Sequence, residues 1–143
     1  MGAADLCRTS EGARLVFATS FDERYPPDNI LDGNSKTFWI TTGMFPQEFL
    51  ISFHKQVKIH KLTLQCYFVR SIRIEKSVTE EPWDLESLVE KDLAHTEGQL
   101  QTEEFIFPGA QATFLRFIIQ SAFDNFVSVH RVSVEGTADS PLA

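Results

Sequence analysis

Short stretches in which apolar residues alternate with polar ones, broken by turn residues about every ten positions, constrain the fold of this chain most. Within residues 58–68, for example, Leu62, Leu64 and Cys66 recur at every second position after Ile59. Such alternation puts one row of side chains on the core face of a strand. The pattern predicts an all-β fold, an antiparallel β-sandwich with strands at residues 15–19, 48–53, 58–68, 71–76, 103–107, 113–121 and 127–136.

One segment, residues 84–93, is compatible with two structures. Leu85, Leu88, Val89 and Leu93 fall at near-helical spacing, which is typical of an amphipathic helix. A bent strand fits the same residues, and the all-β organisation of the rest of the chain favours it.

The length predicts a single domain. A chain of 143 residues buries roughly 70% of the surface that it exposes when unfolded, enough for a stable core. We assign residues 1–138 to this domain and expect 139–143 to form a frayed tail.

Charge and hydropathy exclude two classes of partner. The formal net charge of −7 opposes binding to nucleic acid or anionic lipid, because such binding depends on Lys and Arg neutralising phosphates. No apolar run approaches the roughly 18 residues of a membrane span, and the charges of Asp5, Arg8 and Glu11 leave no room for the apolar core of a signal peptide. We therefore expect a cytosolic protein in which Cys7 and Cys66 are free thiols.

Catalytic patterns are missing from the sequence. Neither cysteine has a His, Asn or Asp in a recognisable catalytic relation to it. Glu80 and Glu81, like Glu103 and Glu104, are adjacent, so on a strand their carboxylates face opposite sides and cannot act on one substrate. The glycines are dispersed and form no phosphate-binding loop. We predict that the protein is not an enzyme.

The loop between Tyr25 and Trp39 has two interpretations. Ca²⁺ takes six to eight oxygen ligands, and a tight loop can supply them from a carboxylate, a hydroxyl and inward-turned carbonyls. Asp32 and Thr37 have the first two groups, and the carbonyls of Asn29 and Asn34 can converge around the turn at Gly33. The alternative is a simple Asx-turn at Asp32 that leads into a buried Trp39.

The same stretch, Pro26 to Trp39, resembles the signature loop of the galactose-binding-like family, which includes the discoidin or F5/8 type C domains. Residues 129–136, the main part of the last predicted strand, resemble the closing strand of that family. The resemblance implies a jelly roll and, for calcium-containing members, an acidic residue near the end of the closing strand. It therefore implies one structural Ca²⁺ held by Asn29, Asp32, Asn34, Thr37, Val134 and Glu135.

Three further runs, residues 41–49, 91–100 and 115–124, are similar to a family of small subunits of the intraflagellar transport B complex. That resemblance implies a protein-binding subunit of the cytoplasm and cilium, which pairs with a Rab-like small GTPase as a heterodimer and supports ciliary export of signalling components. The family is also filed with the small heat-shock proteins, but the sequence has no α-crystallin pattern.

The partner-binding face is not evident from the sequence. Aromatic residues are favoured at interfaces, so Phe45, Trp83 and Phe126 are candidates for contacting the partner. The alternative function is a glycan-binding accessory domain of the discoidin type. The adjacent-cysteine disulfide of sugar-binding members is missing here, and the four histidines are scattered, so partner binding is favoured.

Overall fold

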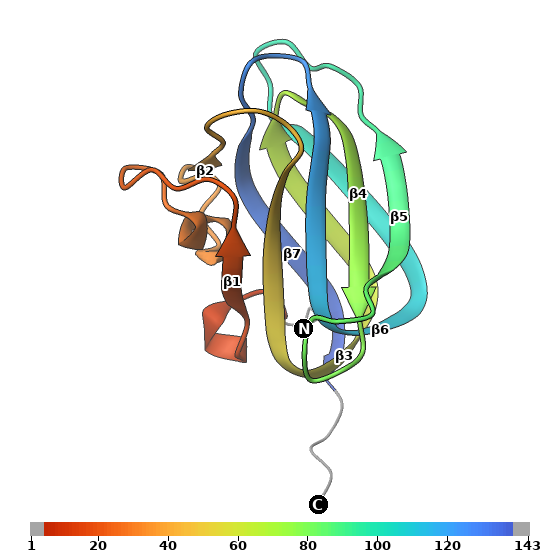
Figure 1. Ribbon diagram of the computed structural model, residues 1–143. Coiled ribbons are helices and arrows are strands. Elements are labelled where there is room, and N and C mark those ends of the chain that lie inside the picture. Colours follow the sequence, from red (N-terminus) through yellow and green to blue (C-terminus); the bar gives the residue numbers. More distant parts are fainter. Residues whose placement is uncertain (1–4, 139–143) are drawn as a thin grey trace, which may run out of the picture.

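The computed structural model describes residues 5–138 and confirms the predicted all-β antiparallel fold (Figure 1). The predicted tail, 139–143, lies outside the described residues. The elements are two short 3-10 helices, η1 (Thr9–Glu11) and η2 (Pro27–Leu31), and the strands β1 (Arg14–Ala18), β2 (Trp39–Ile40), β3 (Gln47–Tyr67), β4 (Val69–Ser77), β5 (Glu86–Asp92), β6 (Gln101–Ala122) and β7 (Ser128–Ala138).

Two long bent strands form the centre of the fold. β3 joins the predicted strands 48–53 and 58–68, and β6 joins 103–107 and 113–121, so the predicted breaks were wrong. The pairing register shifts between Ser52 and Val57, and His54 has a φ of 69°. A bulge of this kind bends a strand without ending it. The polar residues that suggested loops therefore mark bends.

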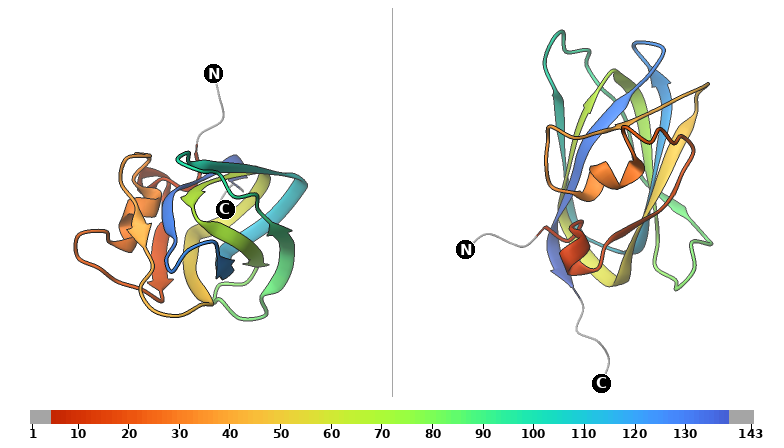
Figure 2. Two further views of the ribbon diagram at one scale, coloured as in Figure 1. Left: turned by 90° about the horizontal axis from the view of Figure 1, so that it is seen from above. Right: turned by 90° about the vertical axis from the view of Figure 1, so that its left-hand side faces the viewer.

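The bends fold the sheet into two layers (Figure 2). The first half of β3 pairs with β1 and with the second half of β6, which continues to β4 and β5. The second half of β3 pairs with β7 and with the first half of β6, and β7 carries the short β2 at its edge. The apolar core lies between these layers.

The ambiguous segment 84–93 forms strand β5, as the all-β organisation favoured. β5 pairs antiparallel with β4, and Val89 lies opposite Ile74. Leu88 and Val89 pack against the core while their neighbours are exposed. Because β5 lies at the edge of the sheet, these two apolar residues are enough to attach it to the core, which explains why its sequence pattern is weak.

Aromatic side chains fill the middle of the core. Phe49 of β3 and Phe117 of β6 stack with ring centroids 4.7 Å apart, and both are fully buried. Trp39 is also fully buried and meets Phe49 edge-on at 5.4 Å. Its indole Nε1 donates to the Ser20 carbonyl at 2.9 Å, so the buried N–H keeps a partner. This bond ties the loop after β1 to the core.

Candidate functional site

The loop that joins η2 to β2 is built on two successive Asx-turns. Asp32 Oδ1 accepts a hydrogen bond from the Asn34 amide at 2.8 Å, and Asn34 Oδ1 accepts one from the Lys36 amide at 3.0 Å. Gly33 between them has a φ of +73°, a conformation that L-residues rarely adopt. The Asx-turn expected at Asp32 is therefore present.

Three oxygen donors converge inside this loop. The Thr37 hydroxyl donates to Asp32 Oδ2, and it also lies 3.0 Å from the Asn34 carbonyl oxygen. The Asn29 side-chain amide donates to the Phe38 carbonyl at 3.0 Å and holds η2 against the end of the loop. A carboxylate, a hydroxyl and a carbonyl are the hard ligands that Ca²⁺ prefers, so the chemistry of this part of the loop fits such an ion.

The loop is fastened to strand β7 by His130. Its Nδ1 forms a hydrogen bond of 2.7 Å with the Ser35 carbonyl, and its ring stacks on Phe38 at 4.9 Å. His130 is buried, with 8% of its surface exposed. This histidine therefore holds the loop against β7.

Val134 and Glu135 meet other groups. The Val134 carbonyl accepts from the Leu6 amide at 2.9 Å, and the Glu135 carboxylate lies 3.8 Å from Lys61 Nζ. Glu135 is five residues from His130, about 16 Å along an extended strand. Within residues 5–138, no hydrogen bond or ion pair joins Glu135 to the loop. The structure thus brings together Asp32, Asn34 and Thr37. Val134 and Glu135, the other end of the predicted site, instead contact Leu6 and Lys61.

Arg8 adds a positive charge beside the loop. A Cβ built on Gly33 would lie 2.2 Å from Arg8 Nη1, so the guanidinium packs directly against this glycine. Like charges repel, so Arg8 in this position opposes a cation in the loop. Within residues 5–138 there is also no cluster of three or more His, Cys, Asp or Glu side chains placed to hold a metal.

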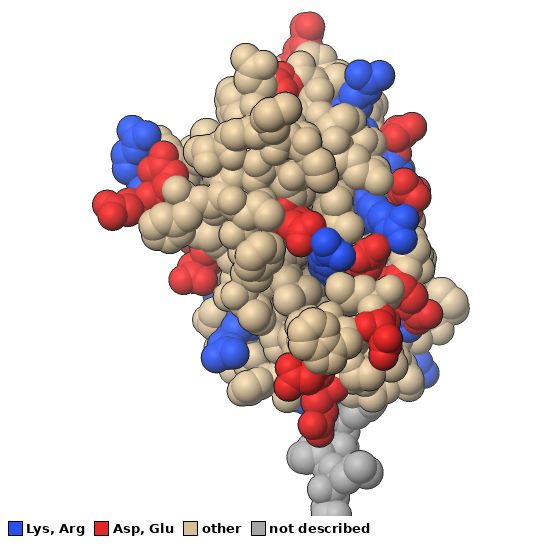
Figure 3. Space-filling view, viewed as in Figure 1, with Lys and Arg blue, Asp and Glu red and all other residues tan. Residues whose placement is uncertain are grey.

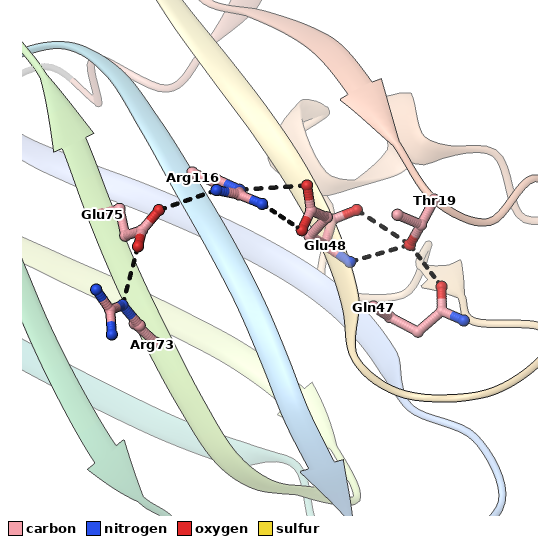
Figure 4. A network of polar contacts seen from close by, with 6 residues as sticks. All are labelled: Thr19, Gln47, Glu48, Arg73, Glu75 and Arg116. Carbon is pink, nitrogen blue, oxygen red and sulfur yellow. Dashed lines mark hydrogen bonds and ion pairs between the residues drawn. The ribbon is translucent and has the colours of Figure 1, made fainter. Parts of the chain in front are cut away.

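A network of ion pairs crosses the outer face of the first layer (Figure 4). Arg116 contacts Glu48 through Nη2 at 2.7 Å and Nε at 3.2 Å, and it contacts Glu75 through Nη1 at 3.1 Å. Arg73 Nε reaches the other oxygen of Glu75 at 2.9 Å. Hydrogen bonding to Glu48, followed by the charges of Glu48 and Glu75, raises the pKa of Arg116. Each carboxylate already has a guanidinium, so the network links β3, β6 and β4 and leaves neither acid available for proton transfer.

Other titratable groups are also engaged. Glu103 pairs with Lys91 at 2.8 Å, whereas its neighbour Glu104 pairs with Lys61 at 3.2 Å, so adjacent carboxylates turn to different strands. The two cysteines, Cys7 and Cys66, are free and buried. Burial raises the pKa of both thiols, which keeps them protonated near neutral pH and poorly nucleophilic.

The predicted partner-binding aromatics occupy different environments. Trp83 is 67% exposed, Phe45 packs half-buried against the core, and Phe126 meets Phe68 edge-on at 5.2 Å. Sequence reasoning missed Phe17 and Phe21, which are 49% and 67% exposed. For Phe17 the signal was the unbroken apolar run of residues 15–18, which leaves an apolar side chain on both faces of β1, whereas Phe21 lies outside that run.

These exposed residues border a groove of about 230 Å³, here called the β1 groove, lined by residues 15–18, 20–21 and 26–28. Its walls are β1 and the start of η2.

Comparison with known proteins gives two levels of relationship. The family model for the F5/8 type C domain matches residues 16–132. The human intraflagellar transport protein 25 homolog is 59% identical over 143 residues, which is 100% of this chain and 99% of the relative. The mouse homolog is 61% identical over 142 residues, 99% of each chain. The chain belongs to the intraflagellar transport protein 25 family.

The family extends to a green alga. Intraflagellar transport protein 25 of Chlamydomonas reinhardtii is 39% identical over 132 residues, 92% of this chain and 69% of the relative. The match to the F5/8 type C domain supports the jelly-roll fold that the resemblance of the loop and of the closing strand implied.

Solved structures agree on the fold. A family 32 carbohydrate-binding module of NanJ from Clostridium perfringens, in complex with galactose, has a TM-score of 0.78 at 17% identity, covering 94% of this chain and 98% of that one. A putative chitobiase fragment from Bacteroides thetaiotaomicron has a TM-score of 0.82 at 14% identity, covering 99% and 96%. At these identities the likeness shows the fold alone. Neither short helix within residues 5–138 has the length or apolar character to cross a bilayer.

Proposed function

We propose that the chain is a non-enzymatic, protein-binding subunit of the intraflagellar transport B complex. In this proposal it pairs one-to-one with a Rab-like small GTPase subunit of the same complex, in the cytoplasm and the cilium, and supports export of signalling components from cilia. The observation that carries the proposal is the likeness to intraflagellar transport protein 25 homologs along the whole chain.

The geometry supports a binding role over a catalytic one. The ion-pair network of Arg116, Glu48 and Glu75 is internally satisfied, and burial keeps the thiols protonated. A sandwich fixed in this way presents a stable surface, which suits recognition of a folded partner.

Co-expression with the Rab-like GTPase tests the pairing. We expect a stable one-to-one complex on size-exclusion chromatography with light scattering, with similar affinity for the GTP-analogue and GDP forms if the pairing is constitutive. Co-purification from ciliated cells should recover other subunits of the transport complex. Two separate monomers at micromolar concentration would contradict the proposal.

We also propose one structural Ca²⁺ centred on Asp32, Asn34 and Thr37, the part of the predicted ligand set that the loop brings together, with Asn29, Val134 and Glu135 as the remaining candidates. The observation that favours it is the convergence of the Asp32, Asn34 and Thr37 oxygens. An ion that binds only the folded state stabilises it by RT ln(1 + [Ca²⁺]/Kd), about 2.7 kcal/mol at a hundredfold excess over Kd.

Melting with calcium or with chelator tests this second proposal. Calcium should raise the melting temperature, and Asp32→Ala should abolish most of that rise because it removes a formal charge from the ligand set. Glu135→Ala, measured in parallel, decides whether the closing strand provides a ligand. An unchanged calcium response in this variant would restrict the ligands of the ion to the loop. Arg8→Ala should lower the Kd for calcium, because it removes the positive charge packed on Gly33. A calorimetric titration without calcium heat would contradict the proposal and leave Asp32 with its hydrogen bonds inside the loop.

A further inference from the structure

Exposed apolar side chains gather at the β1 groove. Val16, Phe17 and Phe21 line it and are 46%, 49% and 67% exposed. The other large exposed apolar residues are distributed among separate loops and strands. Scattered residues of this kind are ordinary, whereas a contiguous apolar patch marks a contact surface. β1 and η2, which provide most of the lining residues, contact each other and lie on the same side of the molecule (Figure 2, right).

The backbone of β1 explains why these side chains face solvent. Leu15 pairs with Ile51 and Phe17 pairs with Leu50, so Val16 is the extra residue of a bulge. In a regular strand, alternate residues of the run would turn toward the core. The bulge breaks that alternation and leaves two consecutive side chains exposed.

The size of the groove indicates what enters it. Its volume of about 230 Å³ is below the roughly 300–1,000 Å³ of a site for a drug-sized ligand. One or two side chains of a larger partner match this space. The groove is therefore better suited to a protein contact than to a small molecule.

Charge determines the chemistry of the occupant. Among the residues that line the groove in the described part of the chain, only Asp28 is charged, and it is exposed and forms no ion pair within residues 5–138. In Figure 3, charged side chains are fewer on the side of β1 and β3 than on the side of β4 and β5. An apolar groove with one unpaired carboxylate complements an apolar side chain next to Lys or Arg.

A second copy of the chain fits this surface poorly. Edge-to-edge pairing of two β1 strands needs a continuous ladder, and the bulge at Val16 interrupts it. Two copies would also bring together two Asp28 carboxylates on chains that each carry a net charge of −7. A partner that inserts a side chain needs no ladder along β1, and basic groups on it remove the charge repulsion.

We infer that the β1 groove is the docking surface for the partner subunit, which inserts an apolar side chain flanked by Lys or Arg. This inference rests on the proposed pairing with a small GTPase. Phe17 and Phe21 supply the apolar contact, and Asp28 pairs with the basic group.

Isothermal titration calorimetry of the full chain against the Rab-like GTPase tests the groove. Phe21→Ser should weaken binding about tenfold or more, because truncating a central aromatic contact has effects of this size. Asp28→Lys should weaken it by a similar factor, with a smaller loss at high salt. Two matched controls, Ile106→Ser at a 71% exposed site and Glu97→Lys at an exposed loop, should leave the affinity unchanged.

The outcomes separate the inference from the proposed function. All four variants lie at exposed positions, so unchanged melting temperatures will show that they fold. A wild-type complex that tolerates both groove variants overturns the groove and leaves the pairing intact. Loss of binding in Trp83→Ser alone would also overturn it and place the contact near Trp83. A wild-type homodimer that Phe21→Ser dissociates would make the groove a self-association surface, and absence of any wild-type complex would overturn both proposals.

Discussion

The two sides of this molecule are stabilised in different ways. In the sandwich, apolar side chains such as Phe49, Ile59 and Phe117 are fully buried between long paired strands. On the side of β1, η2 and β2, the chain follows loops that individual side chains hold in place, among them Gln47 and His130. The sandwich supplies rigidity, and the loop side carries the oxygen-rich loop and the β1 groove. Binding residues are expected on loops that a rigid scaffold positions.

The largest expected effect contrasts a buried and an exposed aromatic residue. Phe117→Ala should lower the free energy of unfolding by about 3–5 kcal/mol, because it leaves a cavity against Phe49. Phe21→Ala should change it by no more than about 0.5 kcal/mol, because Phe21 is 67% exposed. Chemical denaturation measures both. Comparable losses would show that the loop side is as tightly packed as the sandwich.

The next effect concerns the side chain that connects the two regions. Gln47 is buried, its Nε2 donates to the carbonyls of Thr42 and Met44 at 2.9 and 2.7 Å, and its Oε1 accepts from Ser20 Oγ at 2.6 Å. Gln47→Ala removes all three bonds and leaves the Met44 carbonyl without this partner, while Ser20 Oγ and the Thr42 carbonyl keep their bond to each other, and we expect a loss of about 1 kcal/mol or more. Gln111→Ala, at an exposed site of β6, is the control and should be neutral. Equal stability of the two variants would contradict this role of Gln47.

The parts of the fold that could be predicted from the sequence are those that depend on interactions between residues close together in the chain. Alternation in residues 58–68 and 113–121 predicted strands because burial on one face depends on local sequence. The joining of these segments into β3 and β6 depends on bulges such as the one near His54, which the sequence does not mark. β2 was missed because two residues show no periodicity.

The candidate site was predictable only in part, for the same reason. The Asx-turn at Asp32 is a local feature, so the loop chemistry was evident from the sequence. The surroundings of Glu135 depend on which distant segment packs beside β7. That segment is the N-terminal one, whose Leu6 amide donates to the Val134 carbonyl. The contact of Arg8 with Gly33 likewise joins distant segments.

Two glycines with similar backbones isolate the contribution of Arg8. Gly33 and Gly98 have φ values of +73° and +68°, but only Gly33 has a neighbour within 4 Å of an added Cβ. Alanine at either position should cost about 1–2 kcal/mol from left-handed strain. The guanidinium is the flexible end of a long side chain, so we expect the two losses to be similar. A clearly larger loss for Gly33→Ala would show that Arg8 is held rigidly over the loop.

The smallest expected effect is at the tip of the loop side. The side-chain hydrogen bond from Arg24 lowers the pKa of Asp22 below its usual value. A carboxyl group whose pKa is lowered in the folded state stabilises the protein at pH values above its unfolded-state pKa. This stabilisation is lost as the pH falls through the folded-state pKa. Arg24→Ala should raise the pKa of Asp22 toward its usual value in an NMR titration and flatten this acid dependence. An unchanged Asp22 titration would mean that the pair does not persist in solution.

Hydrogen–deuterium exchange of the chain with and without the Rab-like GTPase tests the central claim most directly, because it reports on both regions at once. The account predicts slower amide exchange in residues 14–28, which contain β1 and the groove, and no change in β5 (Glu86–Asp92) at the far edge of the sheet. Protection confined to β5 and the neighbouring loop around Trp83, with residues 14–28 unaffected, would contradict it.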